Sequence, residues 1–231
     1  MSSPDISALP AQPWRTLADI DLSLHVPAAG VLLGADRSGN IACLPAIQPR
    51  PVRIGLVGGV GVARLIAHRL LAVGCQVTVY SQRQSAWQRL WNKVGGRRMI
   101  FAQRSVRWPG VPAGPRAPQA LVLDAPEAPP NWVGDAPWCT VIHVADRVPT
   151  RSEFWRAADV VVVCGPGHGE AVLSLRNRPD AVLADELRPG EVALCGRAGT
   201  TIVRLDVPPA EMELVSDDPS GPFGLPREHA R

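Results

Sequence analysis

Residues 53–80 constrain the fold of this chain more than any other segment. An apolar run leads into Gly58 and Gly59, an amphipathic stretch extends to Gly74, and a second apolar run ends at Tyr80. Apolar residues with a helical period predict a helix that buries one face, and continuous apolar runs predict strands that are buried on both faces. The segment therefore predicts a strand, a glycine turn, a helix and a second strand, the unit from which helix-covered parallel sheets are built.

The rest of the chain continues this alternation. Further strands are predicted at 99–102, 120–124, 140–144, 160–164, 181–184, 191–195 and 200–205, and helices at 85–94, 150–158 and 169–175. Strands that alternate with helices fit right-handed crossovers between parallel strands. The predicted fold class is therefore α/β, with a mostly parallel sheet covered by helices.

Composition divides the chain into four parts. Residues 1–20 are polar and contain prolines, which predicts a flexible lead-in. Two apolar runs around the turn-forming residues 36–40 predict a small β-hairpin, which together with a short linker occupies 21–51. The α/β domain is expected over 52–207, and prolines and acidic residues predict a disordered tail over 208–231.

The turn after the first strand has the spacing of the dinucleotide-binding motif G-x-G-x-x-G. Gly58 falls on the first glycine, Val60 on the second and Ala63 on the third. The second glycine normally lets a pyrophosphate approach the backbone at the helix N-terminus. Val60 puts a β-branched side chain in that space, whereas Gly59 and Gly61 on either side allow a shifted turn. The motif is therefore altered at the position where a cofactor would make its closest contact.

Residues 53–80 resemble the Rossmann family, as found in nicotinamide-dependent dehydrogenases and reductases. The resemblance implies a Rossmann-like sheet, with a cofactor that also contacts the end of the second strand. That strand end usually carries an acidic residue for the ribose of NAD, but Ser81 and Arg83 follow here and favour the 2′-phosphate of NADP. Because the turn is altered, the sequence predicts that no cofactor binds. If a cofactor does bind, the sequence predicts NADP. The candidate cofactor residues are Gly58, Gly59, Gly61, Ala63, Ser81 and Arg83.

No other motif predicts catalysis. The sequence contains no G-x-x-x-x-G-K-[ST] loop, no G-x-S-x-G turn and no H-E-x-x-H pair, so no catalytic residue and no metal ligand is predicted. A second glycine turn, at 165–169, contains His168 and is interpreted as a plain turn, with an anion site as the alternative. Asp124, at a predicted strand end, is interpreted as a turn cap, and His143 as a buried residue of the core.

Composition also argues against several classes of protein. A formal charge of +3 without a basic block gives nucleic-acid binding no electrostatic support. The chain has neither an apolar run of about 18 residues nor the pattern of a signal peptide at its start, so it is expected to be cytoplasmic and not inserted in a membrane. Five cysteines without metal-ligand spacing fit reduced, mostly buried thiols.

Two functional hypotheses follow. The first is a non-catalytic Rossmann-like scaffold or adaptor that acts through protein partners or as a homo-oligomer, because tryptophan and arginine are frequent in its loops and favoured at interfaces. Residues 31–39 resemble soluble actinobacterial proteins associated with type VII (ESX) secretion, which implies an accessory role in such a system. The alternative hypothesis is an NADP-dependent oxidoreductase or a dinucleotide-binding regulator.

Overall fold

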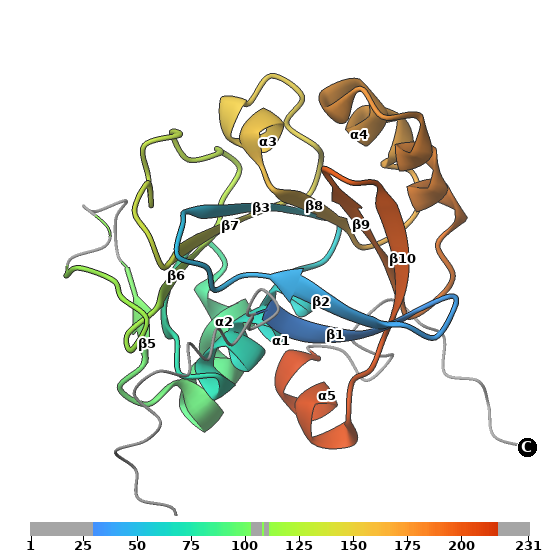
Figure 1. Ribbon diagram of the computed structural model, residues 1–231. Coiled ribbons are helices and arrows are strands. Elements are labelled where there is room, and N and C mark those ends of the chain that lie inside the picture. Colours follow the sequence, from blue (N-terminus) through green and yellow to red (C-terminus); the bar gives the residue numbers. More distant parts are fainter. Residues whose placement is uncertain (1–29, 103–107, 109–110, 217–231) are drawn as a thin grey trace, which may run out of the picture.

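The computed structural model describes residues 30–102, 108 and 111–216 of the chain, and within them one ten-stranded sheet with helices on both faces (Figure 1). The strands are β1 (Gly30–Asp36), β2 (Ile41–Pro45), β3 (Val52–Val57), β4 (Gln76–Ser81), β5 (Met99–Phe101), β6 (Gln119–Asp124), β7 (Cys139–Ala145), β8 (Val160–Val163), β9 (Glu191–Gly196) and β10 (Thr200–Leu205). The helices are α1 (Val60–Ala72), α2 (Gln84–Leu90), the π-helix η3 (Trp91–Gly95), α3 (Glu153–Ala157), α4 (Gly169–Arg176), the 3₁₀-helix η4 (Pro179–Glu186) and α5 (Pro209–Val215). The predicted α/β fold class is confirmed.

The sheet has a parallel part and an antiparallel part. Its strand order is β2-β1-β10-β9-β8-β3-β7-β6-β4-β5. All pairs from β8 to β5 are parallel, and all pairs from β8 outward to β2 are antiparallel. Every residue of β6 and β7 is buried, as expected of central strands with helices or loops on both faces.

The strand order differs from that of the usual dinucleotide-binding Rossmann sheet. In the usual Rossmann order, 3-2-1-4-5-6, the first two strands of the βαβ unit are neighbours. Here β3 and β4, which flank α1, are separated by β7 and β6. The connection through α1 therefore passes over two intervening strands. The local sequence pattern of residues 53–80 is the same whether or not strands lie between the two that it connects, so it could not predict this arrangement.

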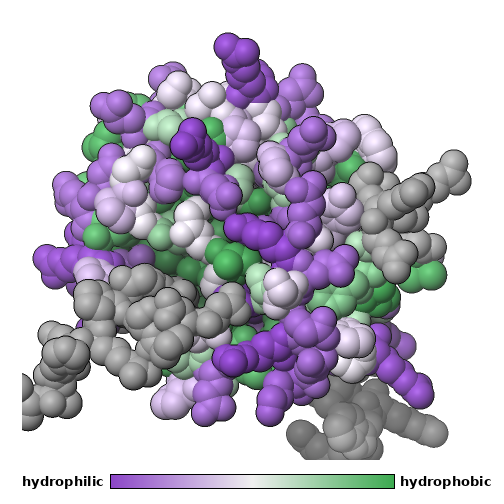
Figure 2. Space-filling view, turned by 180° about the vertical axis from the view of Figure 1, so that it is seen from behind, coloured by the Kyte–Doolittle hydropathy of each residue, from purple (hydrophilic) through white to green (hydrophobic). Residues whose placement is uncertain are grey.

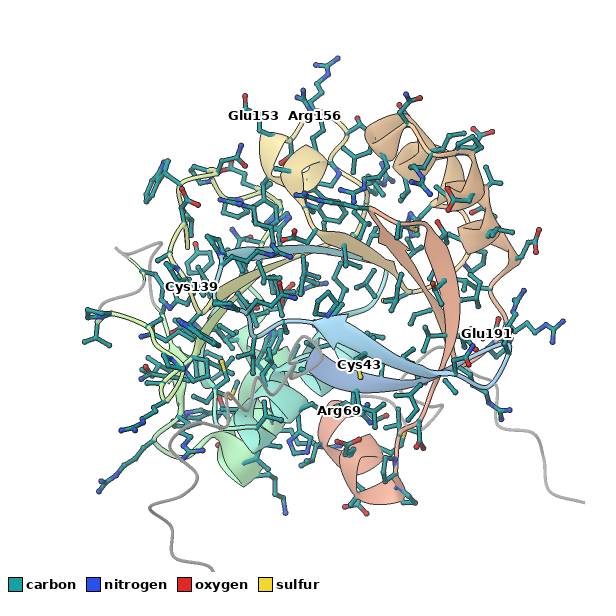
Figure 3. The ribbon with its side chains drawn as sticks, viewed as in Figure 1. Cys43, Arg69, Cys139, Glu153, Arg156 and Glu191 are labelled. Atoms are coloured by element: carbon teal, nitrogen blue, oxygen red, sulfur yellow. The ribbon has the colours of Figure 1, made fainter. Side chains whose placement is uncertain are left out.

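The predicted hairpin is part of this sheet. Strand β1 pairs with both β2 and β10, in a register that places Gly34 opposite Leu205. The guanidinium of Arg37, in the hairpin turn, lies 2.8 Å from the carboxylate of Glu191 at the start of β9 (Figure 3). The division of the chain into separate parts at residue 51 stays a prediction.

The segment from Pro208 onward, expected to be disordered, contains helix α5. Arg69 of α1 donates hydrogen bonds to Glu211 of α5, with 2.5 Å between Nη2 and Oε2 (Figure 3). Val215 is fully buried. Contacts with α1 thus stabilise a helix in a segment whose prolines and acidic residues had predicted disorder. Residues 217–231 of the expected tail, and the expected lead-in at 1–20, lie outside the described residues.

Two apolar clusters pack against the sheet, one on each face. Helices α1, α2 and α5 cover one face, and α3 and α4 cover the other (Figure 1). Seen from behind, hydrophilic side chains cover most of the surface, with apolar side chains showing between them (Figure 2). None of the helices in the described part of the chain is long and apolar enough to cross a membrane.

Candidate functional site

The carboxyl ends of the parallel strands meet at one edge of the sheet, where open α/β sheets usually bind ligands. A cleft of about 480 Å³ lies there, which we call the carboxyl-edge cleft. The residues that line it follow β4, β6 and β7: Gln82, Arg83, Asp124, Ala125, Pro126, Val144, Ala145, Asp146, Arg147, Val148 and Pro149.

Asp124 is the centre of a polar cluster at this edge. It is 1% exposed, and its carboxylate accepts hydrogen bonds from the Ser81 hydroxyl at 2.7 Å and the Trp87 indole at 3.0 Å. Arg83 also donates to it through Nε, at 3.3 Å, and through Nη2. Burial alone would raise the pKa of Asp124, but the hydrogen bonds from Arg83, Trp87 and Ser81 outweigh burial, and the pKa lies below its ordinary value. Asp124 is therefore an ionised carboxylate held by fixed donors.

Arg83 connects this cluster to the cleft. Its hydrogen bond to Asp124 raises its pKa, and a second contact joins its Nη1 to Asp146 at 3.3 Å. The sequence prediction selected Ser81 and Arg83 but interpreted Asp124 as a turn cap. The signal that it missed was an acid at the end of a fully apolar strand, where an ionised group needs donors close by.

The glycine turn has a different surrounding. Gly58 has a φ of +85°, which favours glycine, and its N–H donates to the carbonyl of Ala145 at 3.2 Å. A Cβ at Gly59 would lie 2.8 Å from the Cβ of Cys164, and one at Gly58 would lie 3.2 Å from Nε2 of His168. These glycines therefore let the loop after β8 approach the turn, whatever else they bind.

The remaining turn positions belong to α1. The helix begins at Val60, which is partly buried and packs against the apolar cluster on that face. Gly61 and Ala63 are buried inside the helix. Val60 therefore turns part of its side chain toward the core, and the predicted obstruction by this residue is weaker than the sequence indicated.

The structure brings only part of the predicted cofactor site together. Ser81 and Arg83 share the Asp124 cluster, whereas Gly58, Gly59, Gly61 and Ala63 lie at the end of β3. Since three strand spacings separate β3 from β4, the two groups are roughly 14 Å apart. In a Rossmann fold, adjacent strands bring these groups onto one dinucleotide. The predicted arrangement around NADP is therefore not formed here.

His143 is buried beneath α3 and hydrogen-bonded at both ring nitrogens. Its Nδ1 accepts from the Trp155 indole at 2.7 Å, so Nε2 carries the hydrogen and donates to the carbonyl of Ala125 at 2.9 Å. Burial lowers the pKa of His143, which keeps the ring neutral. The residue fixes the start of the loop that lines the carboxyl-edge cleft.

This burial predicts a dependence of stability on pH. A histidine with a lowered pKa binds fewer protons in the folded than in the unfolded chain, whose ordinary value is about 6.5. The free energy of unfolding is therefore highest above that pH. It decreases as the pH is lowered further, by at most about 1.4 kcal/mol per pH unit. Urea unfolding between pH 8 and 5 should show this slope, and His143→Gln should flatten it. Equal slopes for both proteins would contradict the assignment.

Comparison with solved structures identifies the fold more closely. The chain is similar to the pCW3 conjugation coupling protein TcpA, in a structure with ATPγS: the TM-score is 0.53 at 9% sequence identity, covering 80% of this chain and 68% of TcpA. B204, the DNA-packaging ATPase from Sulfolobus Turreted Icosahedral Virus, gives a TM-score of 0.48 at 11% identity, covering 69% of this chain and 98% of B204. No known protein family and no curated protein matches the sequence.

A third similar structure belongs to a type VII system, with which residues 31–39 had suggested a link. It is the cytoplasmic domain of the Thermomonospora curvata Type VII Secretion ATPase EccC, with a TM-score of 0.46 at 12% identity over 84% of this chain and 30% of that one. TcpA, at 9% identity, shows the fold alone.

The similarity to TcpA corrects the functional predictions. The non-catalytic scaffold or adaptor, and the NADP-dependent oxidoreductase given as its alternative, are both contradicted by the fold that the chain shares with TcpA, whose structure contains ATPγS. The cofactor prediction, none or NADP, is corrected with them, because the structure that shares the fold contains ATPγS.

The turn after β3 departs from the P-loop motif, a phosphate-binding loop of many nucleotide-binding proteins. With Gly58 as the first glycine of G-x-x-x-x-G-K-[ST], the last three positions are Ala63, Arg64 and Leu65. Arg64 is 2% exposed and donates to the carbonyl of Ala86 at 2.6 Å, and Leu65 is fully buried. No lysine or hydroxyl therefore stands at the positions that hold phosphate and Mg²⁺ in that loop.

The other half of a magnesium site is also altered. In P-loop NTPases, Mg²⁺ is held by the loop hydroxyl and by a carboxylate, and Asp124 is a buried carboxylate at this edge of the sheet. The guanidinium of Arg83 already neutralises it. Among the described residues, no group of three or more His, Cys, Asp or Glu side chains forms a metal site. These residues do not fit Mg²⁺ bound in the P-loop manner.

Proposed function

We propose that the chain binds a nucleoside triphosphate across two adjoining cavities at the carboxyl edge of the sheet. The first is the carboxyl-edge cleft. The second is an apolar groove of about 460 Å³ against β4, β6 and the proline-rich loop that follows β6. The observation that carries the proposal is that the cavities share three lining residues, Gln82, Ala125 and Pro126, and thus form one continuous depression.

The carboxyl-edge cleft suits the phosphates. Arg83 and Arg147 both line it, and guanidinium groups bind phosphate oxygens through two parallel hydrogen bonds. Arg83 is oriented by Asp124, so little side-chain entropy is lost on binding. Asp146, 85% exposed, can move away from Arg83 when a phosphate takes its place.

The apolar groove suits the base. Its wall includes the rings of Tyr80 and Trp132 and the side chain of Leu123. Trp132 is 70% exposed, which leaves an aromatic face for stacking. Stacking of a base on an aromatic side chain contributes about 1 to 3 kcal/mol. TcpA, which shares the fold, was determined with ATPγS, and this supports a nucleotide as the occupant.

Titration of the full chain with ATPγS tests the proposal. We expect binding by calorimetry in the presence of EDTA, because the contacts are arginines and not a metal. Arg147→Gln should weaken binding about tenfold, the loss of one charged hydrogen bond. Adenosine and pyrophosphate, each matching one cavity, should each bind more weakly than ATPγS.

Arg116→Gln removes the same charge from an exposed turn outside both cavities and serves as the control, with an unchanged Kd. Failure of ATPγS to bind, or binding that Arg147→Gln and Arg116→Gln weaken alike, would contradict the proposal. Binding that appears only with added Mg²⁺ would instead assign the phosphates to a metal site.

A further inference from the structure

A second cavity of polar character lies at the opposite, amino edge of β8. It has a volume of about 330 Å³, and we call it the amino-edge pocket. Four of the residues that line it are arginines, and the full set is Arg156, Ala158, Leu175, Arg176, Arg178, Gly196 and Arg197. They come from α3 and the residue that follows it, from the end of α4 and the start of η4, and from the end of β9 and the turn after it, so separate elements converge on one positively charged depression.

Two of these guanidinium groups are held rigidly by backbone carbonyls. Arg176 donates through Nη1 to the carbonyl of Ala158, at 2.5 Å, and Arg178 donates through Nη1 to the carbonyl of Arg197, at 2.8 Å. Carbonyl oxygens orient the Arg176 guanidinium but do not neutralise its charge, whereas Arg178 is also paired with the Asp180 carboxylate. Burial lowers the pKa of Arg176; the charges of Arg197 and Arg178 act in the same direction, and those of Cys195 and Asp159 oppose them. Several guanidinium groups therefore lie close together in this pocket.

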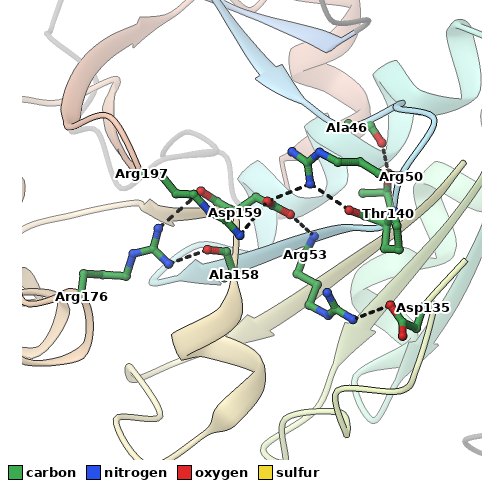
Figure 4. Close-up of polar contacts among 10 residues, drawn as sticks. Ala46, Arg50, Arg53, Asp135, Thr140, Ala158, Asp159, Arg176 and Arg197 are labelled. Atoms are coloured by element: carbon green, nitrogen blue, oxygen red, sulfur yellow. Dashed lines mark hydrogen bonds and ion pairs between the residues drawn. The ribbon is translucent and has the colours of Figure 1, made fainter. Parts of the chain in front are cut away.

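The neighbouring carboxylates do not balance this charge. Asp159 accepts from the Arg50 guanidinium and from the backbone N–H of Arg53, both at 2.9 Å, and lies 3.6 Å from Arg197 (Figure 4). Asp180 pairs with Arg178 at 3.2 Å. Two carboxylates thus lie against the four arginines of the pocket, and one of the two, Asp159, is shared with Arg50 outside it.

The remaining two pocket arginines reach the solvent. Arg197 is 78% exposed, and Arg156 of α3 extends from the helix away from the sheet (Figure 3). Both can therefore close on a ligand that rests on the fixed pair, Arg176 and Arg178. Fixed donors at the base and mobile donors at the rim are suited to an anion with several oxygens.

We propose that the amino-edge pocket binds a phosphate group, as free phosphate or as the terminal group of a small phosphorylated ligand. The excess positive charge requires a multiply charged anion, and guanidinium pairs match phosphate oxygens in geometry. The volume is at the lower end of the range for ligand pockets, which favours a small ligand over an extended chain. This site is independent of the nucleotide proposed at the carboxyl edge.

The test uses the full chain with Arg147→Gln, which weakens the carboxyl-edge cleft. Inorganic phosphate, pyrophosphate and glycerol 3-phosphate are titrated by calorimetry and thermal shift, with chloride at matched ionic strength. We expect at least one of them to bind and to raise the Tm. The titrations distinguish the two sources. Binding of inorganic phosphate alone would identify free phosphate as the ligand, and tighter binding of glycerol 3-phosphate would identify a phosphate ester.

Arg156→Gln combined with Arg197→Gln should weaken that binding at least tenfold, because both rim donors are exposed and their loss leaves the fold intact. Arg204→Gln, an exposed arginine on β10 outside the pocket, is the control and should change the Kd less than twofold. The proposal is overturned if none of the three phosphate compounds binds, or if the control weakens binding equally.

Discussion

Replacement of Trp155 by alanine is expected to lower the free energy of unfolding by about 4 kcal/mol. Trp155 of α3 is fully buried, and its ring lies against β3, where a Cβ at Gly55 would be 2.8 Å from Cε3. The substitution leaves a cavity over the centre of the sheet. It also removes the N–H that satisfies Nδ1 of His143 at 2.7 Å, which adds the desolvation cost of a buried acceptor.

Urea unfolding followed by far-UV circular dichroism measures this effect, since fluorescence changes when a tryptophan is removed. Trp155→Phe keeps most of the packing but not the hydrogen bond, and should cost about 1 to 2 kcal/mol. Trp132→Ala, at a site 70% exposed, should stay within about 0.5 kcal/mol of the parent. A loss below about 1 kcal/mol for Trp155→Ala would show that α3 does not anchor this face.

The second large effect is expected for Asp124→Ala, with a loss of about 2 to 3 kcal/mol in the free energy of unfolding. The substitution leaves the Ser81 hydroxyl and the Trp87 indole without their acceptor. Arg83 can turn toward water, because its side chain is 45% exposed, so the loss is smaller than for a fully buried ion pair.

Asp146→Ala is the matched control. Its carboxylate also contacts Arg83, but it is 85% exposed, and an exposed ion pair contributes less than about 1 kcal/mol. Because the pKa of Asp124 is lowered, its contribution is present above the ordinary value of about 3.9 and is lost as the pH falls below it. The difference in stability between parent and Asp124→Ala should therefore shrink toward pH 3. A constant difference would mean that packing, and not ionisation, accounts for the loss.

Much of the fold was predictable from local pattern. Continuous valine, leucine and isoleucine runs predicted β6, β7 and β8, and an apolar stripe between glycines predicted α1. Two predictions were wrong because tertiary contacts override local preference. Residues 181–184 lie in η4, where Ala181 and Ala184 are buried in the core, and α5 forms where Glu211 meets Arg69.

The candidate site was predictable only in part. Ser81 and Arg83 were selected from their place after a buried strand, and both lie at the carboxyl edge. Their common partner, Asp124, is 41 residues from Arg83 in the chain, so no local pattern joins them. The amino-edge pocket was missed for the same reason, since its arginines come from separate elements and no basic block marks them.

Residue type and spacing by themselves determined most of the strands and helices, and that the sheet is mostly parallel, because burial on one or both faces leaves a period in the sequence. Only the tertiary structure decided that β7 and β6 lie between β3 and β4. The reason is that a crossover can pass over any number of strands without changing the local pattern of what it connects. That strand order separates the glycine turn from Arg83. The two halves of the candidate dinucleotide site, which the local motif places together, therefore lie apart.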